Sequence, residues 1–221
     1  MGRKFTEGYN GREREIRVTR IFPESWREDL KKIFEEQLEK VISVRSSDTG
    51  YNEEILRMKI SSMMSLYDYT IHEIVKYRLV EIVNNGIESE INEPTNFSKF
   101  KISIKTLQEC MKKPNELVGV LSKDIESQIN TYSYINFNEF RKLMKILTDE
   151  NIVKNYLEEN EINDRDFEKK FSELVKRRNA IVHKLDIADK MTIERESITE
   201  EEVNEYIEFL KKFVIYILVN I

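Results

Sequence analysis

Three side chains suited to acid–base chemistry at a phosphate group lie close together late in the chain: Arg178, Asn179 and His183. Histidine, with an unperturbed pKa of about 6.5, can both accept and donate a proton near neutral pH. Arginine carries a permanent charge and a planar fork of donors that matches phosphate oxygens. Asparagine can orient the imidazole or donate to the same phosphate. The set predicts a site at which negative charge develops on the oxygens of a phosphate group during a reaction.

The segment from Phe171 to Asp186 has the periodicity of an α-helix, at about 100° per residue. Its apolar residues, with one from the preceding turn, share one side of that helix: Phe167, Phe171, Leu174, Val175, Ile181, Val182 and Leu185. Arg178 lies near the middle of this stripe, where a charge is costly unless the stripe faces a polar cleft or a partner. Asn179 and His183, four residues apart, are neighbours on an adjoining face.

Basic residues flank the three candidates at Lys176, Arg177 and Lys184. Arg177 is rotated by about 100° from Arg178 and so lies off the apolar stripe. Two interpretations stay open for the flanking cations. They could concentrate a phosphate-containing ligand, or they could solvate the helix and balance the dipole at its C-terminal end.

Composition favours a helical protein with a full hydrophobic core. The 221 residues include 35% charged and 40% hydrophobic residues, with only 6 Gly and 3 Pro, so we expect long helices and few turns. One domain is expected over residues 21–221, although two small ones are not excluded, and residues 1–20 are expected to be a polar N-terminal arm.

A net charge of −5 argues against a protein that coats nucleic acid, but it allows a local basic site.

The cysteine content and the apolar segments bear on location. Cys110 is the only cysteine, so no internal disulfide can form and four-cysteine metal sites are excluded. We therefore expect a reducing, cytoplasmic location. The apolar run at 213–219 is far shorter than the ~20 residues that span a bilayer, and no membrane association is expected.

The helices that must position the candidates can be placed from periodicity and capping signals. Ser25 and Glu28 have capping-box spacing and predict a helix that runs to about Val44. A longer, mostly apolar helix is expected over 52–85, closed by Gly86, as the central rod of a bundle. Shorter helices are expected over 100–111, 115–129, 138–147 and 152–157. The motif helix has Asn163 or Asp164 as its cap, and a second capping box at 199–202 opens a last amphipathic helix.

An Arg-Asn pair followed by histidine, late in an all-helical chain, resembles the R-x4-H signature of HEPN domains. The resemblance extends to Leu174-Val175 before the motif and to Ile198-Thr199-Glu200-Glu201-Glu202-Val203 after it. These segments are similar to the RiboL-PSP-type and related defence-associated HEPN families. The similarity is good over the last third of the chain and loose over the long middle helix.

The resemblance implies an all-α, HEPN-type bundle with a long central helix and a C-terminal amphipathic helix. It implies an endoribonuclease that needs no metal or other cofactor and cleaves RNA through attack by the RNA's own 2′-hydroxyl. Arg178, Asn179 and His183 would be its catalytic residues. The composite site would form at a homodimer interface, which would supply a second motif histidine, since His72 is the only other histidine in the chain.

The flanking residues Lys176, Arg177 and Lys184 would bind RNA. A toxin or anti-phage, abortive-infection effector is the implied role, with an antitoxin or another regulatory protein as its partner. HEPN toxins controlled by nucleotidyltransferase antitoxins resemble R-x4-H-x-Tyr, whereas Leu185 stands at the tyrosine position here. Control through modification of that tyrosine is therefore not expected.

Two other classes of function stay open. A HEPN module without catalytic activity could supply a dimer surface or bind a nucleic acid or protein, and the acidic balance would also suit a helical scaffold without a ligand. The presence of arginine, asparagine and histidine together favours the enzyme. Glycine patterns of nucleotide-binding loops and of the Gly-x-Ser-x-Gly elbow do not occur.

Overall fold

A computed structural model of the chain describes residues 25–45, 52–88, 101–129, 133–189 and 191–221. Within these ranges almost all residues are helical, and the extended structure is one small antiparallel ribbon. The all-α prediction is therefore confirmed. The expected polar arm at 1–20 lies outside the described residues.

Eight α-helices follow one another along the part of the chain that the structure describes. They are α1 (Trp26–Ser43), α2 (Asn52–Glu88), α3 (Ile104–Lys112), α4 (Leu117–Ile129), α5 (Phe137–Leu147), α6 (Ile152–Glu159), α7 (Asp164–Lys184) and α8 (Glu200–Asn220). A 3-10 turn, η3 (Pro114–Glu116), lies between α3 and α4. Between α7 and α8, strand β1 (Ile187–Asp189) pairs with β2 (Glu194–Arg195).

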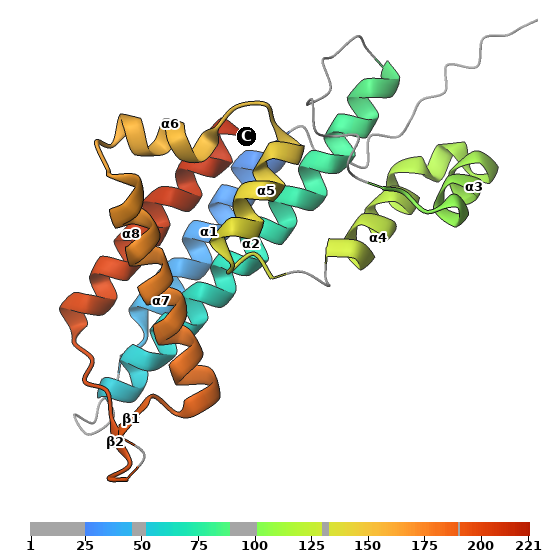
Figure 1. The fold of residues 1–221 in the computed structure, drawn as a ribbon. Coiled ribbons are helices and arrows are strands. Elements are labelled where there is room, and N and C mark those ends of the chain that lie inside the picture. Colours follow the sequence, from blue (N-terminus) through green and yellow to red (C-terminus); the bar gives the residue numbers. More distant parts are fainter. Residues whose placement is uncertain (1–24, 46–51, 89–100, 130–132, 190) are drawn as a thin grey trace, which may run out of the picture.

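The central rod of the bundle is α2, which runs diagonally through the molecule and packs against α1, α4, α7 and α8 (Figure 1). A helix that is surrounded by others must be apolar over most of its circumference. Its buried apolar residues are Ile60, Met63, Met64, Tyr67, Ile71, Ile74, Val75, Leu79, Val80 and Ile82. The expected long central helix is thus present, but it continues through Gly86 to Glu88. Glycine permits a helix to end but does not force it to do so.

Capping explains where the last two long helices begin. The Asn163 side chain accepts a hydrogen bond from the Arg165 N–H at 2.9 Å and caps α7. The Thr199 hydroxyl accepts from the Glu202 N–H at 3.1 Å and caps α8, as its capping-box spacing predicts. Ser25 occupies the N-cap position of α1 as expected, but the capping hydrogen bond is absent: its hydroxyl donates to the Asp29 carboxylate at 2.9 Å and caps no N–H. A carboxylate one turn along the helix thus offers the hydroxyl an alternative partner to the backbone.

An aromatic cluster joins α5, α6, α7 and α8 and fixes the first half of α7. It consists of Phe137, Phe140, Tyr156, Phe167, Phe171 and Phe213, whose rings pack in edge, tilted and stacked pairs. Phe167, Phe171 and Leu174 are each fully buried. By contrast, α3 and α4 stand beside the bundle, with α4 against α2 (Figure 1). No helix in the described ranges is long and apolar enough to cross a bilayer.

Candidate active site

The three candidate catalytic residues lie on the last two turns of α7. The helix has Asp164 and Asp166 in its first turn and His183 and Lys184 in its last, an arrangement that complements the helix dipole at both ends. The buried aromatic residues hold the first half of the helix against the core. The second half therefore extends from a rigid base, and its position depends on what holds its C-terminal end.

Arg178 and Asn179 are in direct contact. An Nη1 hydrogen of Arg178 bonds the Asn179 Oδ1 at 3.0 Å, which holds the guanidinium against the neighbouring side chain. The Arg178 Nε is buried and has no hydrogen-bond partner within the described residues. A buried donor of this kind costs free energy unless a ligand or water satisfies it. Asn179 thus sets the orientation of Arg178, and the remaining N–H groups of its guanidinium can still donate hydrogen bonds to a ligand.

Both residues border a groove of about 510 Å³ between α7 and the segment that enters α5. From the α5 side it is lined by Ser133, Ile135, Asn136, Phe137 and Asn138, and from α7 by Glu168, Phe171, Ser172, Val175, Lys176, Arg178 and Asn179. Phe171, Val175 and Arg178 share this lining, so part of the predicted apolar stripe does border a polar groove. This placement explains how a charged residue is tolerated within the stripe.

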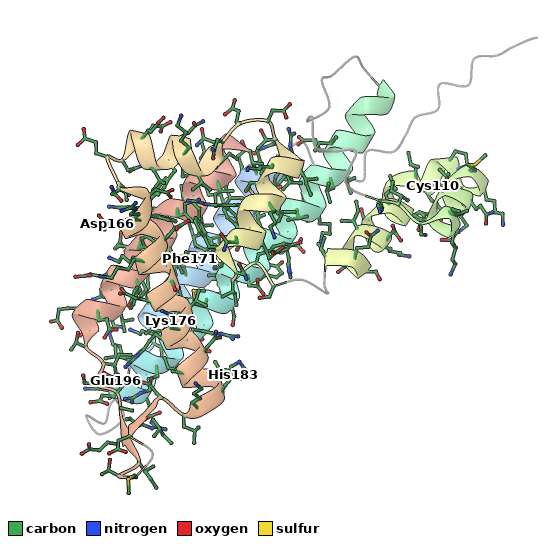
Figure 2. All side chains as sticks on the ribbon, in the orientation of Figure 1. Cys110, Asp166, Phe171, Lys176, His183 and Glu196 are labelled. Carbon is green, nitrogen blue, oxygen red and sulfur yellow. The ribbon has the colours of Figure 1, made fainter. Side chains whose placement is uncertain are left out.

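His183 lies one turn beyond Asn179, exposed to solvent and outside the groove. Figure 2 shows its side chain directed away from the bundle at the C-terminal end of α7. Among the described residues it makes no hydrogen bond or ion pair. Val182 and Leu185 beside it are 43% and 64% exposed, so apolar surface surrounds the histidine. The structure therefore brings Arg178 and Asn179 together and leaves His183 free on the adjoining turn.

Arg177 points in a different direction from Arg178, as the helical wheel predicts. Its Nη2 bonds the carboxylate of Asp186 at 3.1 Å and the carbonyl oxygens of Glu196 and Ser197 at 3.2 and 2.7 Å. The side chain is only 11% exposed. The predicted contact of Arg177 with RNA stays a prediction, but the structure gives this guanidinium a structural role that the sequence did not indicate.

Asp186 is the centre of a buried ionic cluster, and its side chain is only 1% exposed. A second arginine, Arg57 of α2, also pairs with it. The Nε of Arg57 bonds the Asp186 carboxylate at 2.8 Å, and its Nη2 bonds the Glu196 carbonyl at 2.8 Å and Glu53 at 3.0 Å. The pKa of Arg57 is raised: burial acts to lower it, but the hydrogen bonds that Arg57 donates to Asp186 and Glu53 outweigh the burial. We call Arg57, Arg177 and Asp186 the arginine–aspartate cluster.

The arginine–aspartate cluster holds a strained end of α7. Leu185 and Asp186 both have left-handed backbone conformations, with φ of 55° and 58°, which cost roughly 1 kcal/mol or more for residues other than glycine. The Asp186 N–H bonds the Ala180 carbonyl, and its own carbonyl accepts from the Glu196 N–H, both at 2.9 Å. Burial and pairing of Asp186 thus fix the chain reversal that directly follows His183 and Lys184.

The remaining candidates are exposed lysines. Lys176 borders the groove, and Lys184 is the last residue of α7. In both places an ammonium group can reach a phosphate at little desolvation cost, because the charge stays in water. Their predicted role in RNA binding stays a prediction.

His72 belongs to a different part of the molecule. It lies half-buried on α2, and its ring packs edge-on against Tyr134 with 4.7 Å between ring centroids. Burial lowers its pKa, although the nearby carboxylates of Asp68 and Glu73 act in the opposite direction. It lines neither the groove nor the end of α7. One chain therefore presents a single histidine at the motif.

Arg57 and Asp186 were not among the candidates from sequence. An arginine inside the apolar rod α2 is the one local signal that could have pointed to a buried ionic contact. Its partner could not be identified, because Asp186 is 129 residues away in the chain. In the described residues no group of three or more histidine, cysteine or acidic side chains is arranged to hold a metal ion.

An all-helical bundle that presents arginine, asparagine and histidine on one late helix is the pattern of a HEPN domain. The family model described as RiboL-PSP-HEPN matches residues 24–218, and the chain belongs to this HEPN family. The chain has no significant match among curated proteins or among solved structures.

Proposed function

We propose that this protein is an endoribonuclease that cleaves RNA without a metal ion. Nuclease activity is common in the HEPN family. The observation that carries the proposal is the paired Arg178 and Asn179 at the edge of an open groove, with exposed His183 one turn along the same helix. Arg178 and Asn179 offer hydrogen-bond donors for a phosphate, and His183 can carry a proton. All three are within reach of one extended ligand.

In this mechanism each side chain has a separate task. His183 takes the proton from the 2′-hydroxyl, whose oxygen attacks the adjacent phosphorus, and an acid returns a proton to the leaving 5′-oxygen. Arg178 donates to the oxygens on which negative charge develops, an interaction that typically contributes about 2–4 kcal/mol. Asn179 holds the guanidinium through its own Oδ1 and leaves its amide hydrogens for the phosphate or the imidazole.

A homodimer supplies what one chain lacks. General base and general acid are two roles, and one chain has a single histidine at the motif. The exposed Val182 and Leu185 beside His183 form apolar surface that a second copy can cover. Two chains packed through the ends of α7 would place two histidines and two arginines around one RNA strand.

The same proposal includes a cellular role. Free ribonuclease activity would damage the cell that makes it, so a toxin or anti-phage effector of this kind acts in the cytoplasm under control of an antitoxin or another regulatory protein. The resemblance to defence-associated HEPN families supports this role.

The direct test is cleavage of a mixed RNA pool in the presence of a chelator. Wild type should release fragments ending in 2′,3′-cyclic phosphate. His183→Ala should lower the single-turnover rate by at least about 100-fold, because proton transfer contributes 10²–10⁴-fold. His72→Gln serves as the histidine control outside the motif and should retain activity. Equal rates for wild type and His183→Ala, with unchanged helicity, would contradict the catalytic role.

A second candidate function is a catalytically inactive HEPN module that binds a partner. The observation in its favour is the outer face of α3, where Ile104, Leu107 and Met111 are 77%, 55% and 75% exposed. Exposed apolar side chains at helical spacing are typical of interaction surfaces. Absence of cleavage by a folded dimer over a wide range of RNA substrates would favour this candidate.

A further inference from the structure

The groove beside Arg178 lies in line with the motif histidine. Ser172, Lys176, Asn179 and His183 recur at helical spacing and share one face of α7. The first three line the groove, and His183 follows Asn179 after about 6 Å of helix rise. A strand whose phosphate lies between Arg178 and His183 can therefore place an adjacent nucleotide in the groove.

The groove has an apolar wall and a polar, mostly uncharged rim. Ile135, Phe137, Phe171 and Val175 supply the apolar surface, as the lining shows. Hydroxyl and amide groups supply the rim, which consists of Ser133, Asn136, Asn138, Ser172 and Asn179. This combination suits a flat, weakly polar ligand that carries hydrogen-bond groups along its edge.

The charges are divided within the groove. Lys176 and Arg178 lie toward the motif end of the α7 wall. At the other end Glu168 is paired with Arg141 at 3.1 Å, so this carboxylate is compensated. A phosphate is therefore favoured next to Arg178, and a neutral group is favoured farther along.

Nucleobases match the neutral part of this groove. Proteins bind unpaired bases by packing their faces on apolar or aromatic side chains and by hydrogen bonding to their edges. Asparagine offers both donor and acceptor to a base edge. The volume of about 510 Å³ is within the range of small-molecule sites and exceeds what one base needs.

We propose that the groove between α7 and the segment 133–138 is a nucleobase subsite for the nucleotide adjacent to the scissile phosphate. The proposal rests on the ribonuclease function for the position of that phosphate. Asn138 and Ser172 contact the base edge from opposite walls, and Val175 with Ile135 contacts its face. The guanidinium of Arg178 borders the same groove and bonds the phosphate that follows the base. This subsite gives the enzyme a preference among bases on one side of the cut.

Binding can be tested apart from cleavage in the His183→Ala chain. The probes are the hexaribonucleotides A6, C6 and U6, and the best-binding hexamer with a single abasic residue placed at each position in turn. At one position the abasic residue should weaken binding about tenfold, as expected for the loss of one stacked base. Fluorescence anisotropy at fixed salt measures each Kd.

Two groove variants and one control connect this loss to the groove. Ser172→Tyr fills the groove from the exposed face of α7, and Asn138→Ala removes an edge contact without affecting the cap of α5. Ser172→Tyr should weaken the intact hexamer about tenfold and should abolish the penalty of the abasic residue. Asn138→Ala should reduce the difference in Kd among A6, C6 and U6. Asn204→Ala, an exposed asparagine on α8, should change neither.

Each result separates the subsite from the proposed activity. If wild type cleaves RNA but both groove variants retain its cleavage-site preference and hexamer Kd values, the subsite is overturned and the nuclease function stands. If binding depends on the groove but wild type never cleaves, base binding in the groove stands, whereas the nuclease function and the position of the base next to a scissile phosphate fail. If the folded His183→Ala chain binds no hexamer, the subsite is overturned.

Discussion

Arg177 and Arg178 are consecutive residues with opposite environments. Arg177 is directed into the arginine–aspartate cluster, where Asp186 and two carbonyl oxygens receive its Nη2. Arg178 borders the groove, and its one described hydrogen bond is to neighbouring Asn179. Figure 2 shows the corresponding division, with Glu196 on one side of α7 and His183 on the other.

This contrast shows how the end of a helix becomes a defined site. The side of α7 that carries Arg177, here called the closed side, contributes buried ion pairs that hold the left-handed turn after Lys184. The side that carries Arg178, here called the open side, contributes donors that have few protein partners and so remain available to a ligand. We therefore expect substitutions on the closed side to change stability and substitutions on the open side to change activity.

The largest effect is expected from the centre of the closed side. Asp186→Ala removes the carboxylate shared by two arginines and leaves the buried Arg57 with fewer partners, which should lower the free energy of unfolding by roughly 3–5 kcal/mol. Urea denaturation followed by circular dichroism measures the loss. Asp189→Ala, an exposed aspartate three residues on, is the matched control and should cost less than about 1 kcal/mol. Equal stabilities would mean that Asp186 does not hold the turn.

On the open side, Arg178→Lys should reduce cleavage while leaving stability unchanged within about 0.5 kcal/mol. Lysine keeps the charge but not the planar donor fork. The loss of one transition-state donor should raise the barrier by roughly 2–4 kcal/mol, a factor of about 100 to 1,000 in single-turnover rate. A variant that cleaves at the wild-type rate would exclude a bidentate contact.

Substitutions of Arg177 are the matched control for those of Arg178. Arg177→Ala should lower the unfolding free energy by roughly 1.5–3 kcal/mol, because it removes hydrogen bonds to a buried carboxylate and two carbonyls. Arg177→Lys should change the cleavage rate little. The predicted contact with RNA is tested with the same alanine variant: a shallower dependence of the binding constant on salt would support it. A larger rate loss for Arg177→Lys than for Arg178→Lys would reverse the assignment of the two sides.

The smallest expected effect concerns pH. Burial lowers the pKa of His72 below its ordinary value, so in mildly acidic solution the unfolded chain binds more protons at this residue than the folded chain does. The contribution of His72 to stability is therefore complete above the unfolded pKa of about 6.5 and declines as the pH falls below it. His72→Gln should make the decline shallower in that window, as thermal unfolding from pH 7.5 to 5 would show. Parallel curves would contradict the prediction.

Sequence periodicity predicted the helical class, the central rod and the placement of Arg178 within an apolar stripe. These features depend on local spacing, as do the caps at Asn163 and Thr199. The groove itself could not be predicted, because it needs the segment 133–138 beside α7. The arginine–aspartate cluster was missed for the same reason: it joins Arg57 of α2 to Arg177 and Asp186, more than a hundred residues away in the chain. The short β1–β2 ribbon also gave no signal, since its strands have only three and two residues.

The contact between Arg57 and Asp186 spans 129 residues, and this separation has a consequence for folding. Closing so long a loop costs conformational entropy before the ion pair can form, so we expect the turn after the motif to be fixed late. During synthesis the ribosome must also release Glu196 and Ser197 before Arg177 gains its carbonyl partners. A nascent chain that ends at Asp186 would contain every candidate residue but would lack the Glu196 and Ser197 carbonyls that Arg57 and Arg177 bond. Synthesis of the motif and completion of the contacts that hold it are thus separate events in time.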